Sequence, residues 1–249
     1  MIFDPLELNY SKLRAYLDCP FLFRFIYAER KFAPQTPFSS LGLSVHKALG
    51  AFHARPGDLG DLMRYYDEKW LHHGYATPQE CMEFYNRGAK VLEDWWLHWQ
   101  ANPAQVIYSE KSFEFPFEKW KIKGTIDRVD RLPGGKAELL DYKMGFEDRN
   151  EWDVAGSLQL AIYALGLERA LGETVGSVGY FILTSRQKVT APYDPASGEA
   201  TLNLIRETAE KMLALTMDRK GACARCAIRN LCPESEVRTS SGVSGITGF

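Results

Sequence analysis

The chain has 249 residues, of which 45% are hydrophobic and 25% are charged. These values are ordinary for a soluble globular protein, and the length suits one well-buried domain, alone or with a small appendage. The sequence has no apolar run near the roughly 18 residues of a membrane span, and it starts without a secretory signal pattern. We therefore expect a cytoplasmic protein with no membrane partner. The net charge of −2 neither indicates nor excludes a nucleic-acid partner, because a cleft needs only local positive charge.

The first hundred residues have patterns typical of helices. Apolar residues follow helical spacing over 10–27, with a break at Cys19-Pro20 because proline is tolerated in the first turn of a helix. Ser39 and Ser40 are the expected cap of a helix that ends near His53. Further amphipathic helices are predicted over 58–73 and over about 77–100. Their aromatic stripe is expected to be core rather than a base-stacking platform; it comprises Phe84, Tyr85, Trp95, Trp96 and Trp99.

The pattern then changes to strands and helices in alternation. Strands are predicted over 106–117, 119–132 and 136–142, with a hairpin turn at 133–135 between the last two. A helix over 154–171, strands over 177–183 and 187–191, and a helix over 201–217 follow. The Ser/Gly-rich tail over 238–249 is expected to be disordered. This order predicts an α/β fold with a central sheet and an N-terminal helical region packed against it.

Two aspartates and a lysine are the first candidates for a catalytic site. Asp141 and Lys143 are two apart on a predicted strand, so their side chains point to the same face, and Asp127 lies across the hairpin. Carboxylates of this kind hold Mg²⁺ or Mn²⁺, and a nearby ammonium group can orient a metal-bound water. An Asp-x-Lys triplet alone is more often a surface salt bridge. Here the neighbours, such as Ile126 and Leu140, are apolar, and an unpaired carboxylate among them would be costly.

The segments Gly-Thr-Ile-Asp-Arg-Val-Asp (124–130) and Leu-Leu-Asp-Tyr-Lys-Met-Gly (139–145) resemble the RecB-like branch of the PD-(D/E)XK nucleases. Met144 departs from the usual threonine of that family, at a position that is not a metal ligand. The resemblance implies a restriction-endonuclease-like core with a mixed sheet flanked by helices. It also implies that Asp127 and Asp141 bind metal and that Lys143 positions or activates the attacking water.

The same resemblance implies three further parts of the site. Gln159 and Tyr163 are spaced i, i+4 on one helical face, from which they could orient the lysine or the scissile phosphate. His46, four residues after Gly42 on an early helix, is the expected third metal ligand. Glu110, at the start of the first strand, is an additional candidate that could support a second metal. The remaining histidines are expected to lie on the surface. Basic residues that could steer the DNA backbone, although each is more often an ordinary solvated charge, are Arg24, Lys121, Lys123, Arg128 and Arg131.

Three of the five cysteines fall within ten residues, as Cys223-x2-Cys226-x5-Cys232 followed by Pro233. In a reducing cytosol, clustered thiols favour metal ligation over disulfides, and three local thiolates need a fourth ligand from elsewhere. The pattern resembles AddB and the CRISPR-adaptation nucleases, in which an N-terminal cysteine, here Cys19, completes the ligands of a [4Fe–4S] cluster. The resemblance implies a structural cluster that clamps the two ends of the chain. A zinc site with the same four ligands is the alternative.

Together these patterns predict a helical region over 1–105 that contributes Cys19 and His46, a nuclease core over 106–217, and an iron–sulfur segment over 218–237. We expect a stand-alone deoxyribonuclease that acts on single-stranded DNA or DNA ends in repair or recombination, as an exonuclease rather than an endonuclease. The alternatives are a CRISPR-adaptation nuclease that trims spacer precursors and a weakly active DNA-binding subunit of a larger complex. DNA is the expected partner, and helicase or integrase proteins are candidate protein partners.

Overall fold

The computed structural model describes residues 6–31, 35–145, 154–214, 223–226 and 228–235. The chain divides into two compact units. The larger unit is Gln35–Leu204, and the smaller unit combines Met1–Pro34 with Ile205–Phe249. These limits differ from the predicted boundaries at residues 105 and 217, which stay predictions. The tail over 238–249 lies outside the described residues.

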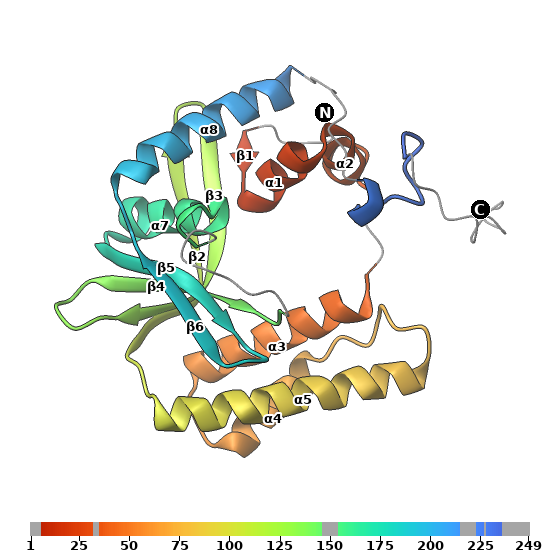
Figure 1. The fold of residues 1–249 in the computed structure, drawn as a ribbon, viewed down its shortest axis with the longest axis vertical. Coiled ribbons are helices and arrows are strands. Elements are labelled where there is room, and N and C mark those ends of the chain that lie inside the picture. Colours follow the sequence, from red (N-terminus) through yellow and green to blue (C-terminus); the bar gives the residue numbers. More distant parts are fainter. Residues whose placement is uncertain (1–5, 32–34, 146–153, 215–222, 227, 236–249) are drawn as a thin grey trace. The chain divides into compact units, whose positions relative to one another are not determined.

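A mixed β-sheet forms the centre of the larger unit (Figure 1). Its strands pair in the order β2 (Val106–Phe117), β3 (Trp120–Arg131), β4 (Ala137–Lys143), β5 (Val175–Ile182) and β6 (Gln187–Pro192). Only the β4–β5 pair is parallel within this series, and helix α7 (Leu158–Leu171) makes the crossover between these two strands. The predicted meander of three strands, followed by a helix and two further strands, is confirmed.

The β3–β4 hairpin places two acids next to each other. Gly134 and Gly135 have φ values of +89° and +86°, which glycine adopts without steric cost, so the chain reverses tightly. The antiparallel pairing then runs from Arg131↔Ala137 to Arg128↔Leu140. Asp127 and Asp141 are the next residues along the two strands, at the point where this pairing ends.

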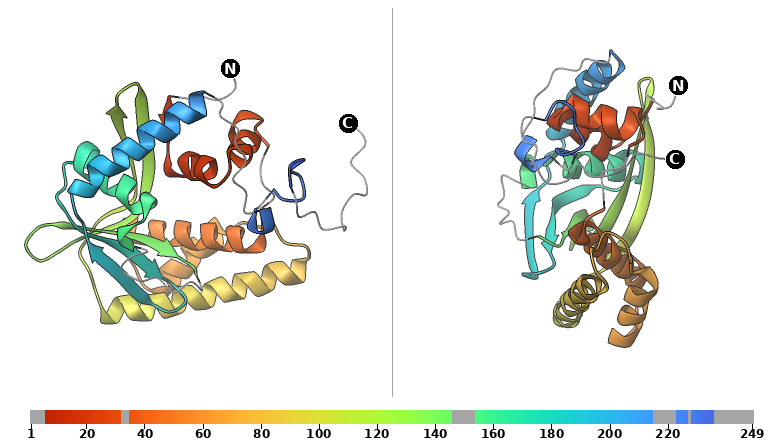
Figure 2. Two further views of the ribbon diagram at one scale, coloured as in Figure 1. Left: turned by 45° about the horizontal axis from the view of Figure 1, so that its top comes forward. Right: turned by 90° about the vertical axis from the view of Figure 1, so that its right-hand side faces the viewer.

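Helices flank the sheet on two sides, with α7 on one side and a helical layer on the other (Figures 1 and 2). The layer consists of α3 (Pro37–Ala54), α4 (Leu59–Lys69) and α5 (Pro78–Ala101). Its buried cluster includes Trp95 together with Tyr142 and Phe181 of the sheet. The aromatic stripe of α5 therefore belongs to the core, as its sequence predicts.

Several predicted helix starts are wrong by a few residues. Helix α3 begins at Pro37, because the Thr36 hydroxyl accepts a hydrogen bond from the Ser39 amide and the Ser39 side chain accepts one from the Thr36 amide. This reciprocal cap, followed by proline at the first position, is a stronger start signal than Ser39-Ser40. Helix α7 begins after its cap Ser157. Helix α8 (Ala196–Leu213), which crosses from one unit to the other, begins before the predicted Thr201.

The smaller unit contains short elements from both ends of the chain. They are β1 (Glu7–Leu8), α1 (Tyr10–Asp18), α2 (Pro20–Phe23), the π-helical turn η1 (Arg24–Ala28) and the 3₁₀ turn η2 (Cys223–Arg225). The predicted break at Cys19-Pro20 is confirmed, with Pro20 as the first residue of α2. In the part of the chain that the structure describes, no helix combines the length and the apolar run that a membrane crossing needs.

Candidate active site

The structure brings the predicted site residues to one place in the larger unit. They come from α3 (His46), β2 (Glu110), β3 (Asp127), β4 (Asp141, Lys143) and α7 (Gln159, Tyr163). The contacts and charge interactions among them, rather than their order in the sequence, define the site.

Asp141, Lys143 and Gln159 form a closed ring of polar contacts. The Asp141 side chain is almost fully buried, and its Oδ2 lies 2.6 Å from Lys143 Nζ. Gln159 Nε2 donates to Asp141 Oδ1 at 2.7 Å, while Gln159 Oε1 accepts from Lys143 Nζ at 3.1 Å. Gln159 Nε2 also lies 3.4 Å from Tyr163 Oη. The single amide of Gln159 therefore orients both the acid and the lysine, and the predicted shared face of Gln159 and Tyr163 is confirmed.

His46 and Asp127 make a second pair. His46 Nδ1 lies 3.2 Å from Asp127 Oδ2, and the Tyr142 amide donates to the same oxygen at 2.9 Å. The Asp127 carboxylate thus accepts a hydrogen bond from the Tyr142 amide, which lies just beyond the last paired residues of β3 and β4. Burial lowers the pKa of His46, but the hydrogen bond and charge of Asp127 and the charges of Asp141 and Glu110 outweigh it, so the pKa is raised.

The acids of the site are crowded enough to disfavour their charged forms. Burial raises the pKa of Asp141 to about 6, the charge of Asp127 adds to this, and Lys143 acts against it. Burial of the carboxyl group also raises the pKa of Glu110 to about 7, and the charges of Asp127 and Asp141 contribute. Part of the Glu110 residue is open to solvent, but its carboxyl group shares this acidic surrounding. A divalent cation would relieve the repulsion among these carboxylates, so this group of oxygen donors favours the binding of such a cation.

Glu110 also has an unusual backbone. Its φ is +46°, a left-handed conformation that residues other than glycine and asparagine rarely adopt. The residue falls between the pairs Ser109↔Arg128 and Lys111↔Ile126, opposite Asp127. The irregular backbone therefore lies at the position that faces Asp127 across the strand pair.

The residues present fit a divalent metal ion by their chemistry. Asp141 Oδ2 is buried and accepts no well-directed hydrogen bond from the described residues, although Lys143 Nζ is close. Among those residues, no three His, Cys, Asp or Glu side chains are already grouped around a common point as ligands. Asp141 is turned toward Lys143 and Asp127 toward His46 instead. Carboxylate oxygens with one imidazole are ligands suited to Mg²⁺ or Mn²⁺.

Two residues that were expected to be solvated are internal. His53 is half-buried and its Nε2 lies 2.8 Å from Tyr142 Oη, inside the unit, so the prediction of a solvated surface histidine is wrong. Arg128 is 5% exposed and donates to both oxygens of Asp130 at 2.7 Å, so it is not a free cation for DNA. The other basic candidates also have carboxylate partners: Arg24 pairs with Glu29, Lys121 and Lys123 with Glu114, and Arg131 with Glu173.

The four cysteines predicted as cluster ligands belong to the smaller unit. All are free thiols. Burial raises the pKa of Cys226, and the charges of Cys19, Cys232 and Cys223 add to the rise. Cys19, Cys223 and Cys232 are therefore each within electrostatic range of Cys226, although no three of the described cysteines are spaced as ligands of a single ion. Cys81 lies in α5 and packs against the helical core of the larger unit.

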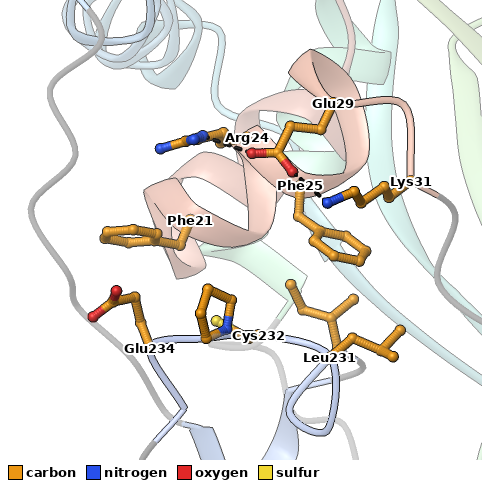
Figure 3. A pocket seen from close by; sticks show the side chains of 10 residues that line it. Phe21, Arg24, Phe25, Glu29, Lys31, Leu231, Cys232 and Glu234 are labelled. Atoms are coloured by element: carbon orange, nitrogen blue, oxygen red, sulfur yellow. Dashed lines mark hydrogen bonds and ion pairs between the residues drawn. The ribbon is translucent and has the colours of Figure 1, made fainter. Parts of the chain in front are cut away.

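A cavity of about 270 Å³ lies beside Cys232 in the smaller unit (Figure 3). Phe21 and Phe25 line one side and Leu231 lines the other. At its edge, the Glu29 carboxylate lies 2.8 Å from Arg24 Nε and 2.9 Å from Lys31 Nζ. The lining thus mixes apolar and charged side chains, and Arg24 and Lys31 already have an anionic partner in Glu29. None of the predicted active-site residues contributes to this cavity.

The family model of the PD-(D/E)XK nuclease superfamily matches residues 7–233. The chain therefore belongs to the PD-(D/E)XK nuclease superfamily. Among solved structures, the protein named "Putative exonuclease" from Eubacterium rectale has a TM-score of 0.59 and 11% identity, with coverage of 96% of this chain and 91% of that chain. This likeness shows the fold alone. The protein SSO0001 has a TM-score of 0.46 and 15% identity, over 95% of this chain and 90% of that chain. No curated protein matches the chain.

Proposed function

We propose that the protein is a metal-dependent deoxyribonuclease of the RecB-like branch of its superfamily. The observation that carries the proposal is the convergence of Asp127, Asp141 and Lys143 with His46 and Gln159 at the ends of β3 and β4. Membership of a nuclease superfamily whose enzymes use divalent metal ions such as Mg²⁺ supports it independently.

In this proposal His46, Asp127 and Asp141 bind Mg²⁺ or Mn²⁺, and Glu110 is close enough to support a second ion. Such an ion acts as a Lewis acid that lowers the pKa of a bound water and stabilises charge on the phosphate. Lys143 carries a fixed positive charge at 2.6 Å from Asp141 Oδ2, so it can orient the attacking water or neutralise charge in the transition state. Gln159 holds Lys143 in place, and Tyr163 adds a hydroxyl beside the Gln159 amide.

The proposed substrate is single-stranded DNA or a DNA end, cut as an exonuclease in repair or recombination. The name of the Eubacterium rectale neighbour supports exonuclease action. The proposed partners, a helicase or an integrase, would be identified by copurification with the tagged full-length chain.

A cleavage assay tests the proposal directly. Labelled single-stranded and double-stranded DNA should be cut in Mn²⁺ or Mg²⁺ and not in EDTA, and Asp141→Ala and Lys143→Ala should each abolish cutting. The exposed pair Lys90–Asp94 on α5, at 2.9 Å, supplies matched controls. Lys90→Ala and Asp94→Ala should cut as the wild type does. Full cutting by both site variants in a clean preparation would reject the assignment.

We also propose that Cys19, Cys223, Cys226 and Cys232 hold a structural [4Fe–4S] cluster. The charge effects of Cys19, Cys223 and Cys232 on Cys226 support this, because they relate the N-terminal cysteine to the C-terminal group. Anaerobic purification should give a brown protein with iron and a broad visible absorbance, and Cys226→Ser should lose both, whereas Cys81→Ser should keep them. A colourless protein with one equivalent of zinc would favour the zinc alternative, and one with neither metal would reject a metal centre.

A further inference from the structure

Tyr142 lies between two site residues in the sequence and contacts two more in space. It separates Asp141 from Lys143 on β4, so its side chain leaves the strand on the opposite face. Its amide donates to Asp127 Oδ2 at 2.9 Å. The Tyr142 residue is 2% exposed, and its ring meets the His46 ring edge to face, with the two ring centroids 6.1 Å apart. Any movement of Tyr142 is therefore transmitted to both halves of the proposed metal site.

The Tyr142 hydroxyl is fixed by two partners. Arg128 Nη1 donates to Tyr142 Oη at 3.3 Å, and a guanidinium group can only donate. The hydroxyl proton is therefore free to point at His53 Nε2, 2.8 Å away, which acts as the acceptor. Burial, together with the charge of Arg128, lowers the pKa of His53 to about 3, so the imidazole is neutral and can accept at physiological pH.

Arg128 is itself held rigidly. Its Nε and Nη2 each donate to an oxygen of Asp130 at 2.7 Å, and its guanidinium group lies 4.9 Å from the Trp99 ring centroid. Arg128 and Asp130 are 5% and 4% exposed. The four side chains of His53, Arg128, Asp130 and Tyr142 are called the Tyr142 network below. They form one continuous chain of hydrogen bonds, in which His53 is half-buried and the other three are buried.

This network joins helix α3 to strand β4. His53 follows His46 by seven residues on α3, about two turns, so both rings leave the helix on the same side. One ring binds the Tyr142 hydroxyl and the other pairs with Asp127. Two attachments at separate points on a helix restrict both its rotation and its sliding over the sheet.

We propose that the Tyr142 network is a positioning device that holds His46 at the correct separation from Asp127 and Asp141 for a divalent ion. The inference rests on the proposed function, because it concerns that same metal site. Mg²⁺ demands near-ideal geometry with ligands at about 2.0–2.1 Å, so a small shift of α3 against the sheet weakens binding. Loss of a hydrogen-bond partner of a metal ligand typically lowers metal affinity by about 10- to 100-fold. The Tyr142 hydroxyl acts one step further out, through His53 and α3, so the lower end of this range applies.

The test is Mn²⁺ binding to the full chain, measured by electron paramagnetic resonance on wild type and Tyr142→Phe. This variant keeps the ring and the amide and removes only the hydroxyl. We expect the Mn²⁺ dissociation constant to rise about tenfold, with KM for DNA unchanged and most of the cutting rate regained at saturating Mn²⁺. Tyr66→Phe is the matched control. Tyr66 is fully buried in the helical layer and its hydroxyl donates to the Tyr85 carbonyl at 3.1 Å, so the control loses a comparable hydrogen bond but should bind Mn²⁺ as wild type does.

A pair of substitutions at His53 separates positioning from packing. His53→Gln keeps an acceptor near the Tyr142 hydroxyl and should retain Mn²⁺ affinity, whereas His53→Leu fills similar space without an acceptor and should weaken binding as Tyr142→Phe does. Equal affinity in His53→Leu and wild type would overturn the proposal.

Asp141→Asn serves as the reference for the metal site itself. If Asp141→Asn abolishes Mn²⁺ binding and Tyr142→Phe binds normally, the positioning role is wrong and the proposed function stands. If Asp141→Asn binds Mn²⁺ normally, the proposed metal site is wrong, and the positioning role is overturned with it.

Discussion

Two buried aspartates of the sheet should respond in opposite ways to the same substitution. Asp130 and Asp141 are 4% and 2% exposed. Asp130 has Arg128 on both of its oxygens at 2.7 Å, whereas Asp141 shares its surroundings with the like charge of Asp127. In EDTA at pH 8, we expect Asp141→Asn to stabilise the fold and Asp130→Asn to destabilise it.

The magnitudes follow from these surroundings. The pKa of Asp141 rises from 3.8 to about 6, and each unit corresponds to about 1.4 kcal/mol, so its ionised form costs at most about 3 kcal/mol of folding stability. This cost already includes the opposing attraction of Lys143, and asparagine resembles the neutral carboxyl group, so the expected gain is about 1–3 kcal/mol. At Asp130 the same change leaves a buried guanidinium poorly paired, and breaking such a pair costs about 3–5 kcal/mol.

The gain at Asp141 should depend on pH in a defined direction. Because the folded-state pKa of this carboxyl lies above the unfolded-state value, the folded protein binds more protons between about pH 4 and pH 6. The wild type therefore loses stability relative to Asp141→Asn as the pH rises through this window. The advantage of the variant should be small at pH 4 and complete above pH 7.

Urea unfolding monitored by tryptophan fluorescence measures these differences. In EDTA the two variants should lie on opposite sides of the wild type. With excess Mn²⁺ the wild type should gain stability by mass action, about 2.7 kcal/mol at one hundred times its dissociation constant, and Asp141→Asn should gain none. A less stable Asp141→Asn at pH 8 in EDTA, with Asp130→Asn unchanged, would refute the electrostatic reasoning.

Three further predictions concern other parts of the larger unit. Gln159→Ala removes the amide that orients Asp141 and Lys143, so single-turnover cleavage should fall at least about tenfold with DNA affinity retained; an unchanged rate would exclude this role. Between pH 7 and pH 5 the wild type should lose about 2 kcal/mol relative to His53→Gln, because a folded-state pKa near 3 leaves the unfolded state with more protons; parallel stability curves would contradict it. Gly88→Ala should lower the free energy of unfolding by about 1–3 kcal/mol, seen as a lower melting temperature, because the new Cβ would meet the Tyr66 hydroxyl and Leu41; a higher melting temperature would show that these neighbours move easily.

The sequence alone predicts the parts of the site that depend on local periodicity. Alternation along a strand correctly places Asp141 beside Lys143, and helical spacing correctly places Gln159 beside Tyr163. The two glycines after Pro133 predict the hairpin that brings Asp127 next to Asp141. Each of these inferences spans only a few residues or one turn, where backbone geometry leaves little freedom.

Other parts of the site depend on tertiary packing and could not be derived from spacing. Nothing local to α3 shows that His46 reaches Asp127, and only the family resemblance suggested it. The same packing hides Arg128 from solvent. A signal was nevertheless present, because Arg128 and Asp130 are two apart on a strand next to the buried Ile126, a pattern typical of an internal ion pair. For His53 the sequence offered no comparable signal.

The discontinuous smaller unit has a consequence for how the protein is made. Residues 1–34 are translated before the larger unit, but the rest of their compact unit, residues 205–249, is translated after it. At a synthesis rate of about 5–20 residues per second, roughly ten seconds or more pass between the translation of these two segments. The intervening larger unit has its own sheet and core and can fold during this delay. Nascent chains stalled just after residue 204 has left the ribosomal exit tunnel should therefore contain a protease-resistant larger unit, while residues 1–34 are still open to digestion.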